Sequence, residues 1–191
     1  PTADAHQRVM VVEVMGRDVG HLALHAGVAG GADVILIPEI PFRVRRVREA
    51  IHQRDLVGKR QSIVVVAEGV VHEDKGAFAR MAGTRRAYGG VGQWLANKLA
   101  EQLAHEVRCV QLGHLQRGGE PTAQDRALAT MFGAEAAAAA ARSDVGVMVR
   151  ISGGVVGTAP LLPKMAIPRP VDIETDPMVA AARRLGIRLG D

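Results

Sequence analysis

Residues 8–40 read RVMVVEVMGRDVGHLALHAGVAGGADVILIPEI and contain two short apolar runs separated by a segment of small residues. The first run, from Arg8 to Val14, is rich in valine, as buried β-strands are. The small residues from about Val19 to Ala29 predict a helix, and two glycines end it. The second run, from Ala32 to Ile37, predicts another buried strand. This order of strand, helix and strand is typical of a parallel α/β unit.

The same alternation continues toward residue 112. The predicted elements are a basic amphipathic helix at Arg43–Arg54, a strand at Ser62–Ala67, a loop at Val71–Gly90, a helix at Val91–His105 and a strand at Val107–Leu112. Unbroken Val and Ile runs between helices favour a parallel sheet with both faces covered. We therefore predict the α/β class, with a Rossmann-like parallel sheet and helices on both faces.

The last part of the chain has a different pattern. It predicts an alanine-rich helix at Thr122–Ala141, a hairpin formed by Val145–Ile151 and Val155–Thr158, a linker at Pro160–Pro170 and a short helix at Asp176–Leu185. Alanine is the strongest helix former, so the alanines need no functional explanation.

The composition is that of a globular protein, with 48% apolar and 23% charged residues among 191. The single cysteine, Cys109, lies in an apolar run, which excludes an internal disulfide and fits a core position in a reducing compartment. No apolar segment approaches the roughly 20 residues that span a bilayer, and no signal segment is recognisable. We expect a cytoplasmic protein with no membrane partner.

A net charge of +4 is compatible with nucleic acid, a membrane surface or small phosphorylated molecules as binding partners. Grooves for single-stranded nucleic acid usually place aromatic residues between the basic ones, whereas here one Trp, one Tyr and three Phe are scattered. Phosphorylated metabolites are therefore the preferred ligand class, with no nucleic acid as a partner. Nucleic-acid binding by the helix at Arg43–Arg54 remains the minor alternative.

A loop follows each of the four predicted strands, and the loops at the carboxyl ends of a parallel sheet converge on ligands. These loops contain Met15, Gly16 and Arg17; Pro38 and Glu39; Glu68 and Gly69; and Gly113, His114, Gln116, Arg117, Gly118 and Gly119. Two arginines and a histidine can hold a phosphate through charge-assisted hydrogen bonds, and a glutamate suits sugar hydroxyls. Taken singly, each residue could equally be a solvated surface charge or part of a turn.

Three segments in this order resemble bacterial-type 6-phosphofructokinase, either ATP- or pyrophosphate-dependent. They are HQRVMVVEVMGRDVGHLALHAGVAGGADVILIPEIPF (residues 6–42), VVVAEG (residues 64–69) and VRCVQLGHLQRGGEPTAQDRALATMFG (residues 107–133). The likeness covers nearly all of residues 6–133 and is looser toward the C-terminus. It implies the phosphofructokinase fold and phosphoryl transfer to fructose 6-phosphate in glycolysis, giving fructose 1,6-bisphosphate, with Mg²⁺ and either ATP or pyrophosphate as the donor.

The resemblance also implies roles for individual residues. Arg17, with the main chain of Met15 and Gly16, matches the segment that contacts the sugar and the transferring phosphoryl group, so Arg17 is the catalytic candidate. Glu68 matches the carboxylate that binds sugar hydroxyls. His114 and Arg117 match the groups that hold the 6-phosphate. A phosphoryl group in flight needs fixed cations, which agrees with this reading of Arg17.

Two further pairs of residues follow from the resemblance. Arg8 and Arg108 match arginines that reach into a neighbouring subunit's site, which implies a homotetramer or homodimer. Asp33 and Lys59 match part of an effector site, but Val57 stands where the family has a second lysine. This departure argues against allosteric control, and the preferred interpretation of Asp33 and Lys59 is that they are ordinary surface residues.

Other family segments have no match in this chain. The catalytic aspartate of a Thr-Ile-Asp-Asn-Asp segment and the glycine-rich donor loop belong upstream in the family, and neither occurs here. We expect residues 1–120 to be a sugar-phosphate-binding lobe, 121–160 to return to the donor-binding lobe, and 161–191 to be a C-terminal linker and helix. The missing N-terminal half would then be a partner and the chain alone inactive; the alternative is a catalytically inactive sugar-phosphate-binding module.

Overall fold

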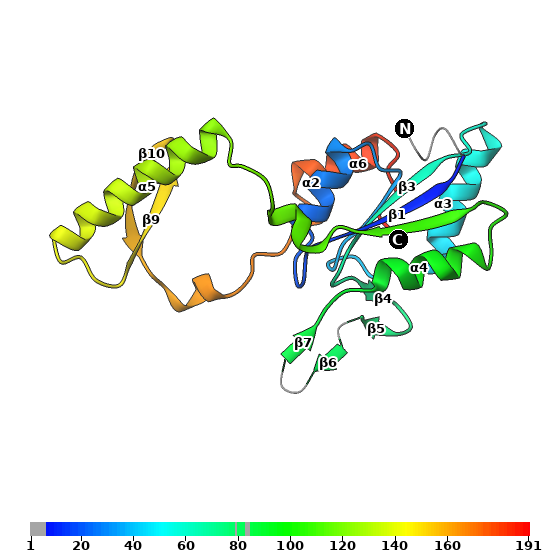
Figure 1. Ribbon diagram of the computed structural model, residues 1–191, viewed down its shortest axis with the longest axis horizontal. Helices are drawn as coiled ribbons and strands as arrows, with labels where there is room; N and C mark the ends of the chain where they lie inside the picture. Colours follow the sequence, from blue (N-terminus) through cyan, green and yellow to red (C-terminus); the bar gives the residue numbers. More distant parts are fainter. Residues whose placement is uncertain (1–6, 79, 83–84) are drawn as a thin grey trace. The chain divides into compact units, whose positions relative to one another are not determined.

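The computed structural model describes residues 7–78, 80–82 and 85–191, which form two compact units. The first unit runs to Arg117 and resumes at residues 169–191, and the second unit comprises residues 118–168 (Figure 1). Within the described residues, no helix is both long enough and apolar enough to cross a membrane.

A four-stranded parallel sheet forms the centre of the first unit. Its strands are β1 (Val9–Val14), β2 (Val34–Leu36), β3 (Ser62–Ala67) and β8 (Val107–Gln111), in the order β2-β3-β1-β8. Most valine and isoleucine side chains of β1, β2 and β3 are almost completely buried, and each of these contributes roughly 1.5–3 kcal/mol by burial. The four predicted strands are therefore confirmed, with small shifts at their ends.

Four helices cover this sheet. They are α2 (His21–Ala29), α3 (Val44–Leu56), α4 (Val91–Ala100) and α6 (Pro177–Arg184). Helix α2 contacts β2, β3 and α6, whereas α4 contacts β1, β8 and α3, so helices lie on both sides of the sheet (Figure 1). The predicted α/β class is confirmed. Helix α4 ends at Ala100 rather than at His105, whose Nε2 lies 2.9 Å from Asp55 Oδ2 of α3.

The segment predicted as a loop, residues 71–90, contains two short hairpins, so that prediction is wrong. Strands β4 (Val71–His72) and β5 (Gly76–Ala77) pair antiparallel, as do β6 (Arg80–Ala82) and β7 (Arg85–Ala87). Strands of two or three residues are too short to show an alternating pattern in the sequence.

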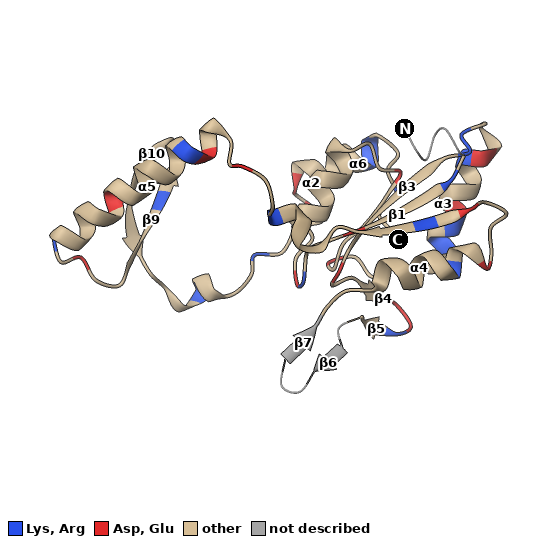
Figure 2. Cartoon of the chain, in the orientation of Figure 1, with Lys and Arg blue, Asp and Glu red and all other residues tan. Residues whose placement is uncertain are grey.

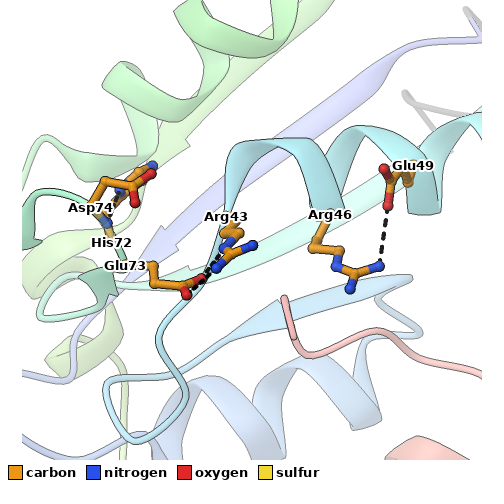
Figure 3. A network of polar contacts seen from close by, with 6 residues as sticks. All are labelled: Arg43, Arg46, Glu49, His72, Glu73 and Asp74. Atoms are coloured by element: carbon orange, nitrogen blue, oxygen red, sulfur yellow. Dashed lines mark hydrogen bonds and ion pairs between the residues drawn. The ribbon is translucent and has the colours of Figure 1, made fainter.

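Tertiary contacts hold the first of these hairpins. His72 is buried and meets the rings of Phe42, Phe78 and Trp94 edge-on, at centroid distances of 5.3–6.5 Å. The neighbouring Glu73 forms an ion pair with Arg43 beside the start of α3 (Figure 3). The hairpin is therefore fixed by residues that are distant in sequence.

The second unit consists of one helix and one hairpin. Helix α5 (Ala123–Ala141) starts with a capping box between Thr122 and Asp125, and strands β9 (Val147–Ser152) and β10 (Val155–Pro160) pair antiparallel. Gly153 and Gly154 have φ of +57° and +81°, as a two-residue hairpin turn requires. The helix and hairpin predictions are confirmed. The predicted linker contains a 3₁₀ turn, η2 (Pro163–Ala166).

Candidate functional site

Main-chain hydrogen bonds hold the ends of three neighbouring strands together. Glu68 N–H donates to Val14 O and Gly69 N–H to Gly16 O, both at 2.9 Å, which joins the loop after β3 to the loop after β1. Leu112 N–H donates to Glu13 O at 3.0 Å, which joins the end of β8 to β1. The carboxyl ends of β3, β1 and β8 therefore lie side by side, in the order of the sheet.

Glycine at position 69 allows the loops after β1 and β3 to touch. A Cβ atom on Gly69 would lie 1.6 Å from the carbonyl oxygen of Arg17, a distance that no side chain can adopt. Gly16, with φ of +144°, has a backbone conformation that favours glycine. This close backbone approach places Glu68 next to Arg17.

Arg17 and Glu68 form a loose pair at this edge. Arg17 Nε lies 3.9 Å from Glu68 Oε1; the Arg17 side chain is 68% exposed and that of Glu68 is 17% exposed. A pair at this distance leaves most of the five guanidinium donors facing solvent, and two carboxylate oxygens remain as acceptors. A cation and a carboxylate are thus available to one polar ligand.

The loop after β8 reaches the same edge through Gln116. This loop is the 3₁₀ turn η1 (Gly113–Arg117), and Gln116 Oε1 accepts a 2.8 Å hydrogen bond from Met15 N–H. His114 and Arg117, on the same turn, are exposed. The predicted residues Met15, Gly16, Arg17 and Glu68 are thus brought together with the turn that carries His114 and Arg117.

Glu39, which follows β2, is used differently from the other loop residues. Its Oε1 accepts hydrogen bonds from Gly20 N–H at 2.9 Å and Val171 N–H at 2.8 Å, at the start of α2. These bonds fix the beginning of α2 and the returning C-terminal segment, so Glu39 has a structural role in the fold.

Arg8 and Arg108 lie at the opposite end of the sheet. Both pair with Glu106, and Arg108 follows Val107, the register partner of Val9 at the beginning of β1. Because a six-residue strand spans about 20 Å, these two arginines cannot join Arg17 around one ligand in the same chain.

Asp33 and Lys59 line one cavity of about 380 Å³ between α3 and the C-terminal segment, together with Arg54 and Arg188. Asp33 is already engaged there, because Arg54 Nη1 lies 2.8 Å from its Oδ1 and Ile63 N–H donates to its Oδ2 at 2.8 Å. The structure therefore places the two predicted effector residues in the same cavity. The charge of the Asp33 carboxylate is already neutralised by Arg54.

Most arginines on the basic face of α3 form ion pairs with acidic side chains. Arg45 and Arg46 both contact Glu49, at 3.3 and 3.4 Å, and Arg54 contacts Asp33. Figure 2 shows acidic residues interspersed among the basic ones of the first unit. An unbroken basic stripe, which nucleic-acid binding would favour, is not formed by these α3 residues.

Sequence reasoning missed two residues that shape the site, Glu13 and Tyr88. Glu13 is 2% exposed and accepts hydrogen bonds from the N–H groups of Gly90 and Gly92 and from the Gln111 amide. Tyr88 lies beside Arg17, with Arg17 Cζ 5.6 Å from the centroid of its ring. The signal for Glu13 was present, since a carboxylate in a valine-rich buried strand requires donors.

Cys109 neighbours Glu13 in the sheet and has no role in this site. Burial and the adjacent carboxylate raise the pKa of the Cys109 thiol above its ordinary value. The thiol therefore stays protonated, which agrees with its interpretation as a partly buried core residue.

The residue types needed for a metal centre do not gather here. Among residues 7–78, 80–82 and 85–191, no three His, Cys, Asp or Glu side chains cluster as they would around a metal ion. The described residues therefore offer no donor set that by itself fits Mg²⁺.

A comparison with family models matches residues 1–140 to the model described as Phosphofructokinase. The chain belongs to the phosphofructokinase family. Among curated relatives, the ATP-dependent 6-phosphofructokinase of Chloroflexus aggregans is 48% identical over 100% of this chain and 52% of its own length. The pyrophosphate–fructose 6-phosphate 1-phosphotransferase of Amycolatopsis methanolica is 52% identical over 80% of this chain and 46% of its own.

Solved structures agree with the phosphofructokinase assignment. The phosphofructokinase of Saccharomyces cerevisiae matches 84% of this chain with a TM-score of 0.69 and 33% identity, over 21% of its own chain. The pyrophosphate-dependent enzyme of Marinobacter aquaeolei matches 99% with a TM-score of 0.74 at 23% identity, which shows the shared fold. This phosphofructokinase chain spans about half the length of the curated relatives it matches.

Proposed function

We propose that this chain is the fructose 6-phosphate-binding part of a 6-phosphofructokinase. The observation that supports it most is the meeting of three strand-end loops carrying Arg17, Glu68 and the turn with His114 and Arg117. In this proposal His114 and Arg117 hold the 6-phosphate through charge-assisted hydrogen bonds, and Glu68 accepts hydrogen bonds from sugar hydroxyls.

Arg17 has the catalytic role in this proposal. Charge develops on the phosphoryl oxygens during transfer, and a fixed cation beside them lowers the barrier. The guanidinium is the exposed cation at the end of β1, next to the main chain of Met15 and Gly16. Removing one such stabilising group typically lowers turnover by a factor of about 10² to 10³.

The chain requires a second part for turnover. Neither of the family's donor-side segments occurs in this sequence, and the relatives are about twice as long. We propose that the missing N-terminal half supplies the base that deprotonates the sugar hydroxyl, together with the site for Mg²⁺ and the donor. Relatives carry both the ATP-dependent and the pyrophosphate-dependent name, so either donor is compatible with this chain.

The second unit is proposed to pack against that missing half. Its exposed large apolar side chains are Met131, Val145, Met148, Ile151, Val155, Leu161, Leu162, Met165 and Ile167. An apolar surface of this kind marks a contact that is completed by other protein. The proposed lobes are therefore residues 1–120 for the sugar phosphate and 121–160 for the donor side, with 161–191 as the C-terminal linker and helix.

Oligomerisation is proposed to complete the site with two further cations. Arg8 and Arg108 lie at the strand end far from Arg17, and Arg108 is 63% exposed on the edge strand β8. In a homodimer or homotetramer they would reach the 6-phosphate bound by the neighbouring subunit. The assembly is expected in the cytoplasm, as is usual for the family.

Calorimetric titration of the 191-residue chain with fructose 6-phosphate tests the proposal. Saturable binding is expected, weakened at least tenfold by His114→Ala and by Arg117→Ala, because each removes one charge-assisted hydrogen bond of about 1.5–3 kcal/mol. Arg45→Ala, on α3, is the matched control and should leave binding unchanged. Absence of binding, or equal binding by all variants, would sink the proposal.

A coupled enzymatic assay for fructose 1,6-bisphosphate separates the two interpretations of this chain, half of an active kinase or an inactive sugar-phosphate-binding module. The chain alone is expected to form no fructose 1,6-bisphosphate with either donor, and to gain activity when the missing half is supplied. If adding that half restores no turnover, the alternative of an inactive sugar-phosphate-binding module is favoured.

The cavity of Asp33 and Lys59 supports a second, regulatory proposal. Lys59 and Arg188 offer cations to a phosphorylated effector, although Val57 replaces the family's other lysine. Titration with ADP and phosphoenolpyruvate, in wild type and in Lys59→Ala, tests it. If neither ligand binds, Asp33 and Lys59 are surface residues whose main contacts are structural.

A further inference from the structure

The Arg17 guanidinium has a neighbour that neither the sequence nor the family match assigns. The ring of Tyr88 lies under it, with Arg17 Cζ 5.6 Å from the ring centroid. The hydroxyl of the same tyrosine donates a 3.1 Å hydrogen bond to Asp18 Oδ1. Tyr88 thus contacts two successive residues of the loop after β1, one through its aromatic face and one through its hydroxyl.

The loop that follows Tyr88 is held by the buried carboxylate of Glu13. Gly90, two residues later, donates its N–H to Glu13 Oε1 and Oε2 at 2.9 and 3.1 Å, and Gly92 N–H donates at 2.7 Å. Gln111 of β8 adds a 2.9 Å hydrogen bond to the same carboxylate. Since Glu13 belongs to β1, the strand that presents Arg17 also anchors the loop that presents Tyr88.

The remaining contacts of Arg17 are weak by comparison. Its pairing distance to Glu68 is 3.9 Å, at the limit for an ion pair, and its side chain is largely exposed. A long side chain in this situation loses rotamer freedom when it binds a ligand, which costs binding free energy. An aromatic face beneath the guanidinium reduces that loss, because the cation–π attraction holds the side chain before the ligand arrives.

We infer that Tyr88 is a positioning residue that holds the Arg17 guanidinium in place for the phosphoryl group transferred to the sugar. The inference rests on the proposed function, in which Arg17 meets that phosphoryl group. Tyr88 acts through Arg17, so its effect should be larger on a ligand that carries a 1-phosphate than on one that lacks it.

Calorimetric titration of the 191-residue chain with fructose 6-phosphate and with fructose 1,6-bisphosphate tests this inference. Tyr88→Leu should weaken bisphosphate binding about two- to fivefold, the range of an exposed cation–π contact, and change fructose 6-phosphate binding less. Tyr88→Phe keeps the ring and should stay within about twofold of wild type. In an Arg17→Gln background, Tyr88→Leu should cause no further loss.

The outcomes separate this inference from the proposed function. If wild type binds neither ligand, or Arg17→Gln does not weaken bisphosphate binding, the proposed function fails and the inference fails with it. If Arg17→Gln weakens binding but Tyr88→Leu does not, or if Tyr88→Leu weakens both ligands equally and additively with Arg17→Gln, only the inference is overturned. Circular dichroism checks folding, and Tyr88→Gln is the second ring-deleting variant should Tyr88→Leu not fold.

Discussion

At the scale of single residues, the site depends on how closely the backbones of the loops after β1 and β3 approach each other. Gly69 lets the backbone after β3 pass against the carbonyl of Arg17, and the conformation of Gly16 turns the chain at the end of β1. The sequence indicated Arg17 and Glu68 as candidates because both follow buried strands. It could not indicate their 3.9 Å separation, since that depends on contacts between segments about 50 residues apart.

Gly69→Ala tests the close approach directly. The added methyl group would meet Arg17 O at 1.6 Å, so the loop must shift, and we expect a loss of roughly 3 kcal/mol in unfolding free energy. Urea denaturation measures it. Gly133→Ala, in α5 with open space around its Cβ position, is the matched control and should be neutral or stabilising by up to about 1 kcal/mol. Equal effects of the two substitutions would contradict the packing described here.

At the scale of elements, the long apolar runs were predictable and the short strands were not. Strands β2 and β3 appear in the sequence as unbroken apolar segments because both faces of this part of the parallel sheet are covered. Strands β4 to β7 have two or three residues each, and β4–β5 is held by the rings around His72. Contacts of this kind leave no local periodicity that sequence reasoning could detect.

Glu13→Gln tests how β1 is joined to α4. The substitution places an amide NH₂ group against main-chain N–H donors in a buried position, which should cost about 1–3 kcal/mol of unfolding free energy. Glu101→Gln, which changes an exposed glutamate paired with Lys98, should cost less than about 0.5 kcal/mol. Comparable losses in urea denaturation would show that the Glu13 hydrogen bonds are unimportant.

The ion pair between Arg43, the residue before α3, and Glu73 of the β4–β5 hairpin makes stability depend on pH (Figure 3). The hydrogen bond from Arg43 lowers the pKa of Glu73 below its ordinary value of 4.5, and a bond from Arg8 does the same for Glu106. A depressed folded-state pKa contributes stability that is present above pH 4.5 and is lost as the pH falls through the folded value. Wild type should therefore lose more stability than Glu73→Gln between pH 6 and 3. Thermal unfolding at several pH values measures this, and an equal fall in melting temperature for the two proteins between pH 6 and 3 would contradict it.

At the scale of the whole molecule, the chain combines a covered sheet with a second unit that exposes apolar side chains. The first unit has a buried core of its own, whereas in α5 the only buried residue in the described structure is Ala139. The sequence predicted the helix and hairpin of the second unit from local signals, namely the alanine content and the two glycines of the turn. Under the proposed function these apolar side chains pack against the other half of the protein, and the relatives are about twice as long as this chain.

The most direct measurement is a crystal structure of the 191-residue chain with fructose 6-phosphate. The ligand should lie at the carboxyl ends of β3, β1 and β8, with its phosphate bonded to His114 and Arg117 and its hydroxyls facing Glu68 and Arg17. A sugar phosphate bound instead in the cavity of Asp33 and Lys59, or found only on other surfaces, would contradict the assignment of this edge as the substrate site.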